Sequence, residues 1–302
     1  MVPRANKHRV ASLRFPSCRY WLFLISLLSV LLHTNALLFD GRVFVSGGLA
    51  ASMSHTLSVP IDVIKTKQQL QPLRFHQKNF PQSALLIIQE EGLSSLLAGS
   101  TPTLSGYFIQ GCLKYGLYDS FKEPISCSFP NLPPIAALAI AGACAEIIAA
   151  TCLCPIEAAR IRMVATKDDA NLIEVLQKTG IVDSFVGLFP ILLKMVPYTS
   201  FQLATYESLR STMDFSSFPD PIIAQLLCAT AAAIVSSLAS QPGDALLTAA
   251  SQDKENNKLD LAGLFRGTQA RLIQMILIVV IQLLANDAIR ESVGLGAIGH
   301  EK

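Results

Sequence analysis

The chain has 302 residues, of which 51% are hydrophobic and only 15% are charged. Soluble domains carry about 25% charged residues, so this composition favours one helical bundle in a bilayer over two soluble domains. The formal net charge of +2 is too small to support nucleic-acid binding through bulk electrostatics.

The first 38 residues differ from the rest of the chain. Basic side chains without any acid fill residues 1–19, and an apolar stretch from Trp21 to Leu32 leads to small residues at 34–36. This layout is typical of a secretory signal peptide. An uncleaved additional membrane helix over 19–38 is the alternative. A mitochondrial presequence fits less well because the stretch is apolar rather than amphipathic, so a secretory-route membrane or a plastid envelope stays open as the destination.

A proline motif occurs three times along the chain. It consists of a proline, an acid two residues later and a cation three residues after the acid. In the third copy the cation is replaced by Leu247. The motif residues are Pro60, Asp62 and Lys65, then Pro155, Glu157 and Arg160, then Pro242 and Asp244. Repetition of this kind indicates one structural unit that is used three times.

Each proline motif ends an apolar run, and these runs cover residues 43–59, 134–154 and 222–241. A second apolar run follows each polar loop and begins near residue 102, 188 or 268. With their motifs the runs can cross ~30 Å of hydrocarbon at 1.5 Å per residue. The sequence therefore predicts an all-α membrane protein. Its six transmembrane helices form three helix-pair repeats, at 42–124, 133–213 and 219–295, with short surface helices between the pairs.

The charged residues of the proline motifs are expected to face the inside of the bundle. An acid and a cation three residues apart lie on one helix face, and unpaired charges are costly in lipid. The proline within each helix removes a backbone donor and predicts a kink. We expect these residues to pair between helices and to close one end of a central cavity. We call them the proline-end gate; because Leu247 is apolar, at most two bridges can form there.

A second motif recurs at the ends of the other three helices. It places an acid and a cation three residues apart after an aromatic residue, which is Tyr118, Tyr206 and, in the third copy, Asn286. We call its charged residues the opposite gate: Asp119, Lys122, Glu207, Arg210, Asp287 and Arg290. Ordinary charge pairs at a bilayer interface are the alternative, which the threefold recurrence disfavours.

The two motifs together resemble the signature of the mitochondrial carrier family, over roughly residues 43–294. The resemblance implies a bundle with threefold pseudosymmetry, a central substrate site and two gates that open alternately. It also implies a transporter that acts as a monomer, rather than an enzyme, in the mitochondrial inner membrane among lipids such as cardiolipin. No nucleophile elbow, glycine-rich phosphate loop or metal-ligand spacing occurs, so no cofactor and no metal site are expected.

Within the family the chain is most similar to phosphate carriers. The run from Pro102 to Tyr118, the segment Lys194-Met-Val-Pro197-Tyr198 and the loss of the third motif cation carry this resemblance. Tyr107, Gln110 and Lys114 share one face of the second helix. We predict that they contact inorganic phosphate together with Lys194 and Arg271, because ammonium and guanidinium groups suit an oxyanion. Lys114 could instead pair with an inward acid, and Arg271 could extend to the membrane interface.

Four residues are candidates for moving a proton with the phosphate, which the resemblance implies. They are His55, Asp62, Glu146 and Glu157, and His55 lies seven residues before Asp62 on the first helix. Histidine titrates nearest neutral pH. A histidine that only packs near the first kink is the alternative.

Three positions depart from the phosphate-carrier pattern. Gln202 stands where a lysine is usual, Ala150 where an acid is usual, and Asn286 where an aromatic residue is usual. Fewer charges in the cavity could alter proton coupling or select another small anion. A dicarboxylate or metal-ion carrier therefore remains an alternative, as does a membrane scaffold that does not transport.

Overall fold

The computed structural model describes residues 40–70, 74–75, 79–166, 172–185, 187–213, 218, 220–251, 268–296 and 298. The N-terminal segment 1–38 lies outside this part. So do the side chains of Asp244, Leu247 and Arg271.

Six long helices dominate the described part, and they occur in three consecutive pairs. The helices are α2 (Gly41–Leu70), α4 (Ser100–Ser128), α5 (Pro134–Thr166), α8 (Leu188–Thr212), α9 (Pro221–Ser251) and α11 (Thr268–Ser292). They have 25 to 33 residues each, which at 1.5 Å per residue is enough to cross a bilayer. The predicted all-α membrane fold with three helix pairs is confirmed.

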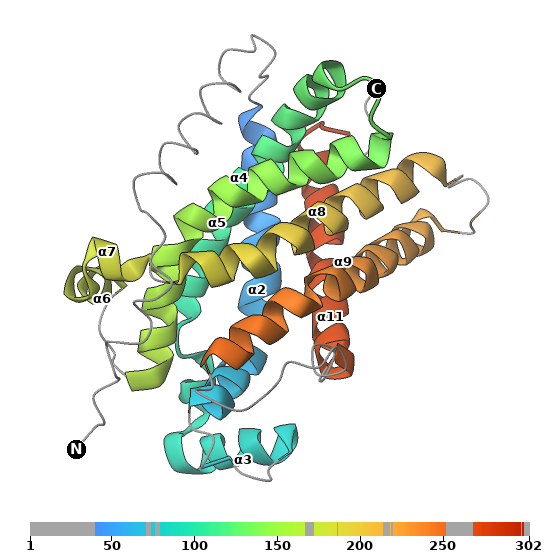
Figure 1. The fold of residues 1–302 in the computed structure, drawn as a ribbon. Helices are drawn as coiled ribbons and strands as arrows, with labels where there is room; N and C mark the ends of the chain where they lie inside the picture. Colours follow the sequence, from blue (N-terminus) through green and yellow to red (C-terminus); the bar gives the residue numbers. More distant parts are fainter. Residues whose placement is uncertain are drawn as a thin grey trace.

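The six helices form a closed ring in chain order. Each helix packs against the next one, from α2 with α4 through to α9 with α11, and α11 packs against α2. Figure 1 shows the long helices side by side, with the α4–α5 loop at one end of the bundle and α3 at the other. Because the ring closes, every helix has one face toward the interior and one toward the outside.

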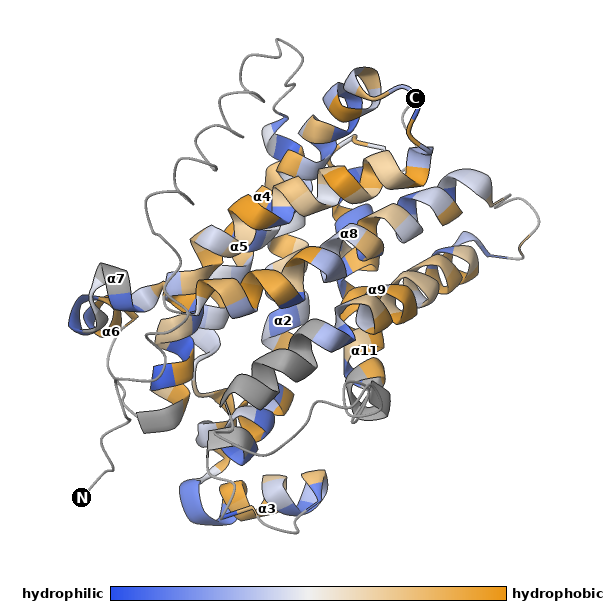
Figure 2. Cartoon of the chain, in the orientation of Figure 1, coloured by the Kyte–Doolittle hydropathy of each residue, from blue (hydrophilic) through white to orange (hydrophobic). Residues whose placement is uncertain are grey.

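The outer faces of the helices carry large apolar side chains, as expected for surfaces in contact with lipid. On α2 a stripe of large apolar side chains at intervals of four residues is exposed: Val45, Leu49, Met53 and Leu57 are 40% to 67% exposed. Figure 2 shows hydrophobic residues along the long helices, and both hydrophobic and hydrophilic residues on α3. Among the described helices only α5 (over Pro134–Val164) and α9 (over Pro221–Pro242) are apolar enough to be identified as membrane spans by composition alone. The others carry polar residues on their inner faces.

Glycines allow α2 and α4 to pack unusually close together. A side chain at Gly47 would overlap Tyr115, and one at Gly111 would overlap Ala51 and the backbone of Gly47. A side chain at Gly48 would overlap Cys112. Small residues at such contacts are the usual means by which membrane helices approach each other, because lipid offers no hydrophobic drive for association.

Short surface helices connect the first two pairs. They are α3 (Phe80–Glu91) and the 3-10 helix η2 (Leu93–Leu97) in the first repeat, and α6 (Leu172–Thr179) and α7 (Ile181–Ser184) in the second. The corresponding segment of the third repeat, 252–267, lies outside the described residues.

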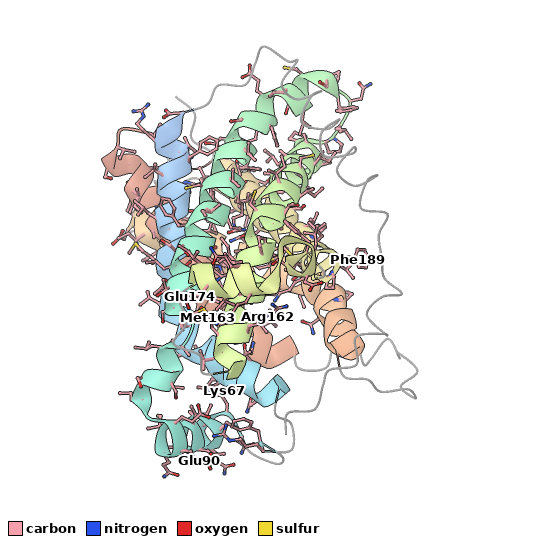
Figure 3. The ribbon with its side chains drawn as sticks, turned by 90° about the vertical axis from the view of Figure 1, so that its left-hand side faces the viewer. Lys67, Glu90, Arg162, Met163, Glu174 and Phe189 are labelled. Atoms are coloured by element: carbon pink, nitrogen blue, oxygen red, sulfur yellow. The ribbon has the colours of Figure 1, made fainter. Side chains whose placement is uncertain are left out.

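A buried ion pair fixes α3 to the end of α2. Lys67 of α2 pairs with Glu91 of α3, and their side chains are only 3% and 2% exposed. Arg74 Nη1 lies 2.6 Å from Glu91 Oε1, and Arg74 also contacts Glu90 at the surface. Figure 3 shows Lys67 near the end of α2 and Glu90 on α3 below it.

Candidate functional site

A buried carboxyl group joins three helices at the centre of the bundle. Glu146 of α5 is fully buried and accepts hydrogen bonds from Gln110 Nε2 of α4, at 3.1 Å to each carboxyl oxygen. Thr199 Oγ1 of α8 donates to Glu146 Oε2 at 2.8 Å. Within the described residues Glu146 makes no ion pair; its hydrogen-bond donors are neutral, and Lys114 is a cation within electrostatic range of it.

A buried ammonium group lies one helical turn further along α4. Lys114 is 2% exposed, and its Nζ donates to Gln202 Oε1 of α8 at 3.3 Å. The ammonium group also lies 4.9 Å from the centre of the Tyr115 ring. In the part of the chain that is described, Lys114 makes no direct salt bridge, but the inward Glu146 lies within electrostatic range of it, so the alternative role as partner of an inward acid stays open. Its hydrogen-bonded partner is an uncharged amide.

His55 and Tyr107 meet between α2 and α4. Their rings stack at a centroid distance of 3.6 Å with 11° between the planes. Both side chains are half-buried. His55 therefore contacts the neighbouring helix as well as sharing α2 with Asp62. This places His55 beside a predicted phosphate contact.

Lys194 lies on α8, a different helix from those that carry this aromatic pair. It is half-buried on α8 and within electrostatic range of both Glu157 and His55. The structure thus brings Lys194 near the proline-end gate, whereas Gln110 and Lys114 lie among α4, α5 and α8. Arg271 belongs to the first turn of α11, and its side chain lies outside the described residues.

The opposite gate forms a closed cycle of three ion pairs, which connect the second helices of the three pairs, α4, α8 and α11. Lys122 Nζ of α4 lies 3.3 Å from Glu207 Oε1 of α8. Arg210 of α8 pairs with Asp287 of α11. Arg290 Nη1 of α11 lies 2.7 Å from Asp119 Oδ2 of α4, which completes the cycle. This end of the bundle is closed in the structure.

Tyrosines reinforce two of the three corners of this cycle. The hydroxyl group of Tyr118 donates to Glu207 Oε2 at 2.9 Å, and the hydroxyl group of Tyr206 donates to Asp287. At the third corner stands Asn286, which is fully buried and whose amide atoms have no hydrogen-bond partner in the described structure. Because Asn286 replaces an aromatic residue, the opposite gate lacks a third hydrogen bond of the kind that Tyr118 and Tyr206 donate.

The chain beyond α11 folds back onto the opposite gate. The backbone N–H of Ile298 donates to Asp287 Oδ1 at 3.2 Å, and Arg290 Nε donates to the carbonyl oxygen of Gly296 at 2.9 Å. The Ile298 side chain is 1% exposed and belongs to the main hydrophobic core. Arg42, at the start of α2, donates to the carbonyl oxygen of Val293 at 3.1 Å. We call the described residues 293–296 and 298 the C-terminal hook.

The proline-end gate is arranged differently from the expectation. Glu157 pairs with Arg160 of its own helix, at 2.6 Å, rather than with a cation of another helix. Asp62 Oδ1 accepts a hydrogen bond from Gln274 Nε2 of α11 at 2.8 Å, and Gln274 Oε1 accepts one from Lys65. For Asp62 and Glu157 the expected ion pairs between helices are therefore absent from the described part. The physical reason is that a spacing of three residues also permits pairing within one helix.

Pro60, Pro155 and Pro242 all lie inside their helices, which continue past them. The side chain of Asp244 lies outside the described residues. Among the described residues, ion pairs between helices close the opposite gate, whereas Glu157 at the proline end pairs within its own helix.

Three features at these sites were not predicted from the sequence. Thr199 contacts Glu146, Gln274 links Asp62 to Lys65, and the C-terminal hook contacts the opposite gate. Gln274 could have been found, because it lies two helical turns from Gln282 and only apolar residues separate the two. Thr199 and the hook carry no sequence motif.

Comparison with known proteins gives a consistent picture. The family model described as mitochondrial carrier protein matches residues 40–128 and 132–217. "Mitochondrial substrate carrier family protein N" of Dictyostelium discoideum is 32% identical over 279 residues, covering 82% of this chain and 93% of that protein. "Mitochondrial phosphate carrier protein 2, mitochondrial" of Arabidopsis thaliana is 34% identical over 188 residues, covering 59% of this chain and 51% of that protein. Human "Solute carrier family 25 member 3" is 25% identical over 279 residues, covering 83% of this chain and 76% of that protein.

Proposed function

The chain belongs to the mitochondrial carrier family, and we propose that it carries inorganic phosphate together with a proton by alternate opening of its two gates. The observation that carries the proposal is the buried Lys114, whose ammonium group donates to an uncharged amide. A buried cation is stable only when counter-charge or good hydrogen bonds compensate for lost water. An oxyanion supplies both. Relatives named as phosphate carriers support the choice of phosphate.

Gln110 and Lys114 share one face of α4. In the proposed site Lys114 supplies the positive charge for phosphate, and Gln110 supplies a neutral hydrogen-bonding group. Gln110 Oε1 has no hydrogen-bond partner within the described residues, so the amide keeps one acceptor available for a P–OH group. Tyr107 and Lys194 add a hydroxyl donor and a second cation nearer the proline-end gate. Arg271 completes the proposed set from α11.

Glu146 is the best-placed proton carrier in this proposal. A buried carboxyl group whose hydrogen-bond donors are all neutral is costly to keep ionised, so Glu146 can take up a proton from the open side, most readily when the phosphate anion balances the charge of Lys114. The protonated form needs an acceptor, and rotation of the Gln110 amide would present its free Oε1 to the new O–H group. Asp62 accepts a hydrogen bond from Gln274, and Glu157 pairs with Arg160. We therefore assign these two acids to the gate rather than to proton transfer.

The mitochondrial inner membrane is the proposed location, since the family and its named relatives are mitochondrial. A monomer surrounded by lipids such as cardiolipin completes the proposal, because the substrate path lies inside one ring of helices.

The experiment is uptake of radioactive phosphate by the purified full chain in liposomes. We expect saturable uptake that increases when the outside is more acidic than the inside. Malonate as a dicarboxylate and a divalent metal ion serve as competitors. If malonate or the metal ion is taken up and phosphate is not, the phosphate proposal is wrong.

Two variants separate the proton carriers. Glu146→Gln should abolish the stimulation by a pH gradient while leaving phosphate–phosphate exchange measurable, because exchange needs no net proton movement. His55→Gln tests the second candidate. Unchanged gradient-driven uptake in His55→Gln removes this histidine from the proton route, and unchanged uptake in Glu146→Gln removes Glu146.

A further inference from the structure

The three repeats place one polar residue at the same position just inside the opposite gate. Each gate motif begins at the equivalent position on α4, α8 or α11, and the residue one helical turn before that position faces the same way. The three residues are Lys114, Gln202 and Gln282, whose exposed fractions are 2%, 0% and 1%. They thus form one ring of polar side chains, which we call the inner layer.

Most of the hydrogen-bonding groups of the inner layer are unused. Lys114 Nζ donates to Gln202 Oε1 across the gap between α4 and α8. Gln202 Nε2 and both amide atoms of Gln282 have no hydrogen-bond partner among the described residues. Buried polar groups are nearly always paired, so several such atoms at one level call for a ligand that pairs with them.

The acids around the inner layer decide what net charge it offers. On the gate side, Asp119, Glu207 and Asp287 each pair with a cation of the opposite gate. On the central side, Glu146 accepts hydrogen bonds from Gln110 and Thr199 and lies within electrostatic range of Lys114. When Glu146 carries the transported proton, as in the proposed function, the layer offers a single positive charge, that of Lys114, beside two neutral amides.

We propose that Lys114, Gln202 and Gln282 together bind one tetrahedral oxyanion, and that the two amides make this layer select a monovalent anion over a divalent one. The inference rests on the proposed function and specifies the charge of its substrate. One ammonium group balances one negative charge, whereas a second negative charge would be buried without a partner. Amides add donors and an acceptor without adding charge. Gln202 and Gln282 are thus specificity-determining residues.

The test uses two competitors whose charges do not change near neutral pH: hypophosphite, which is monovalent, and sulfate, which is divalent. Inhibition of phosphate uptake is measured with the full chain in liposomes. In the wild type we expect hypophosphite to inhibit at least tenfold more strongly than sulfate. Gln202→Lys and Gln282→Lys each add a second cation to the layer and should strengthen inhibition by sulfate about tenfold.

Two further variants serve as controls for these lysine substitutions. Gln202→Met keeps the length of the side chain without charge or hydrogen bonds, and it should weaken inhibition by both anions. Gln177→Lys makes the same change in charge at an exposed position of α6 and should leave both inhibition constants unchanged. Equal inhibition by the two anions in the wild type, or no gain for sulfate in either inner-layer lysine variant, overturns the proposal.

Binding is measured in parallel as the rise in melting temperature of the detergent-solubilised protein with each anion. This readout decides the question for any variant that no longer transports. If the wild type takes up no phosphate, the proposed function fails. The inner-layer proposal then still stands if hypophosphite stabilises the wild type and sulfate stabilises Gln202→Lys. It is wrong if each anion raises the melting temperatures of the wild type and of Gln202→Lys by the same amount.

Discussion

The ion pair between Arg210 and Asp287 should be the strongest of the three pairs that hold the opposite gate closed. Its side chains are 4% and 2% exposed, whereas those of Lys122 and Glu207 are 11% and 12% exposed. Removing one partner of a buried pair costs about 3–5 kcal/mol, because it leaves an uncompensated charge. The variant Arg210→Gln imposes this cost on the closed state alone, since Asp287 regains water when the gate opens.

Two remaining contacts of Asp287 reduce the expected effect. The carboxylate keeps the hydroxyl group of Tyr206 and the backbone N–H of Ile298 as donors. A hydrogen bond to a charged group contributes about 1.5–3 kcal/mol, part of which is already present in the wild type. We therefore expect the closed state to lose about 2–3 kcal/mol, which is roughly a 30- to 150-fold change in the opening equilibrium. Lys122→Gln should cost about 1 kcal/mol, or roughly fivefold.

Access of a thiol reagent to the interior measures this opening. A cysteine replaces Gln282, just inside the gate, in a chain whose native cysteines are replaced, and a membrane-impermeant maleimide is added from the opposite-gate side of oriented liposomes. Alkylation should be fastest in Arg210→Gln, intermediate in Lys122→Gln and slowest without a gate substitution. A change below threefold in Arg210→Gln, or the reverse order of the two variants, refutes the reasoning.

Three other predictions follow from contacts at the two ends of the bundle. Ending the chain at Ser292 removes Ile298 from the core and one donor from the opposite gate, so alkylation in the same assay should rise about tenfold. Lys67→Met leaves the buried Glu91 with a single cation and should lower the melting temperature by about 5–10 °C. Gly111→Val forces α2 and α4 apart and should abolish a cooperative thermal transition.

Each of these changes has a matched control. A chain that ends at Ile298 keeps the hook contacts and should alkylate at the wild-type rate. Glu90→Gln alters an exposed partner of Arg74, with 52% of the Glu90 side chain exposed, and should shift the melting temperature by less than about 2 °C. Gly41→Ala adds a methyl group where no atom lies within 4 Å and should be neutral. Effects as large as those of the test variants would contradict the assigned contacts.

The repeated motifs allowed the architecture to be predicted from the sequence. Three proline motifs and three gate motifs, each on an apolar run, require three similar helix pairs with charges turned inward. The inward charges of Asp119, Lys122 and Glu207 followed from the same physical constraint, although the pattern does not state which acid meets which cation. The pairing depends on the conformation, because an acid can pair within its helix, as Glu157 does with Arg160, or across to another helix.

Contacts that depend on the packing of neighbouring helices could not be predicted. The close approach of α4 to α2 brings Tyr107 against the imidazole ring of His55, a contact that the spacing of residues along either helix does not predict. The C-terminal hook is similar in this respect. Its contact with Asp287 is made by a backbone N–H group, which every residue except proline offers, so no side-chain pattern marks it.

Locking the opposite gate tests the central claim most directly. Cysteines replace Lys122 and Glu207, whose side chains meet across α4 and α8, in a chain without its native cysteines, and a short reducible bifunctional thiol reagent joins them. Phosphate uptake into liposomes is measured before joining, after joining and after reduction. Alternate opening of two gates predicts that uptake stops when the cysteines are joined and returns on reduction. Uptake that continues at the same rate through the locked gate would contradict it.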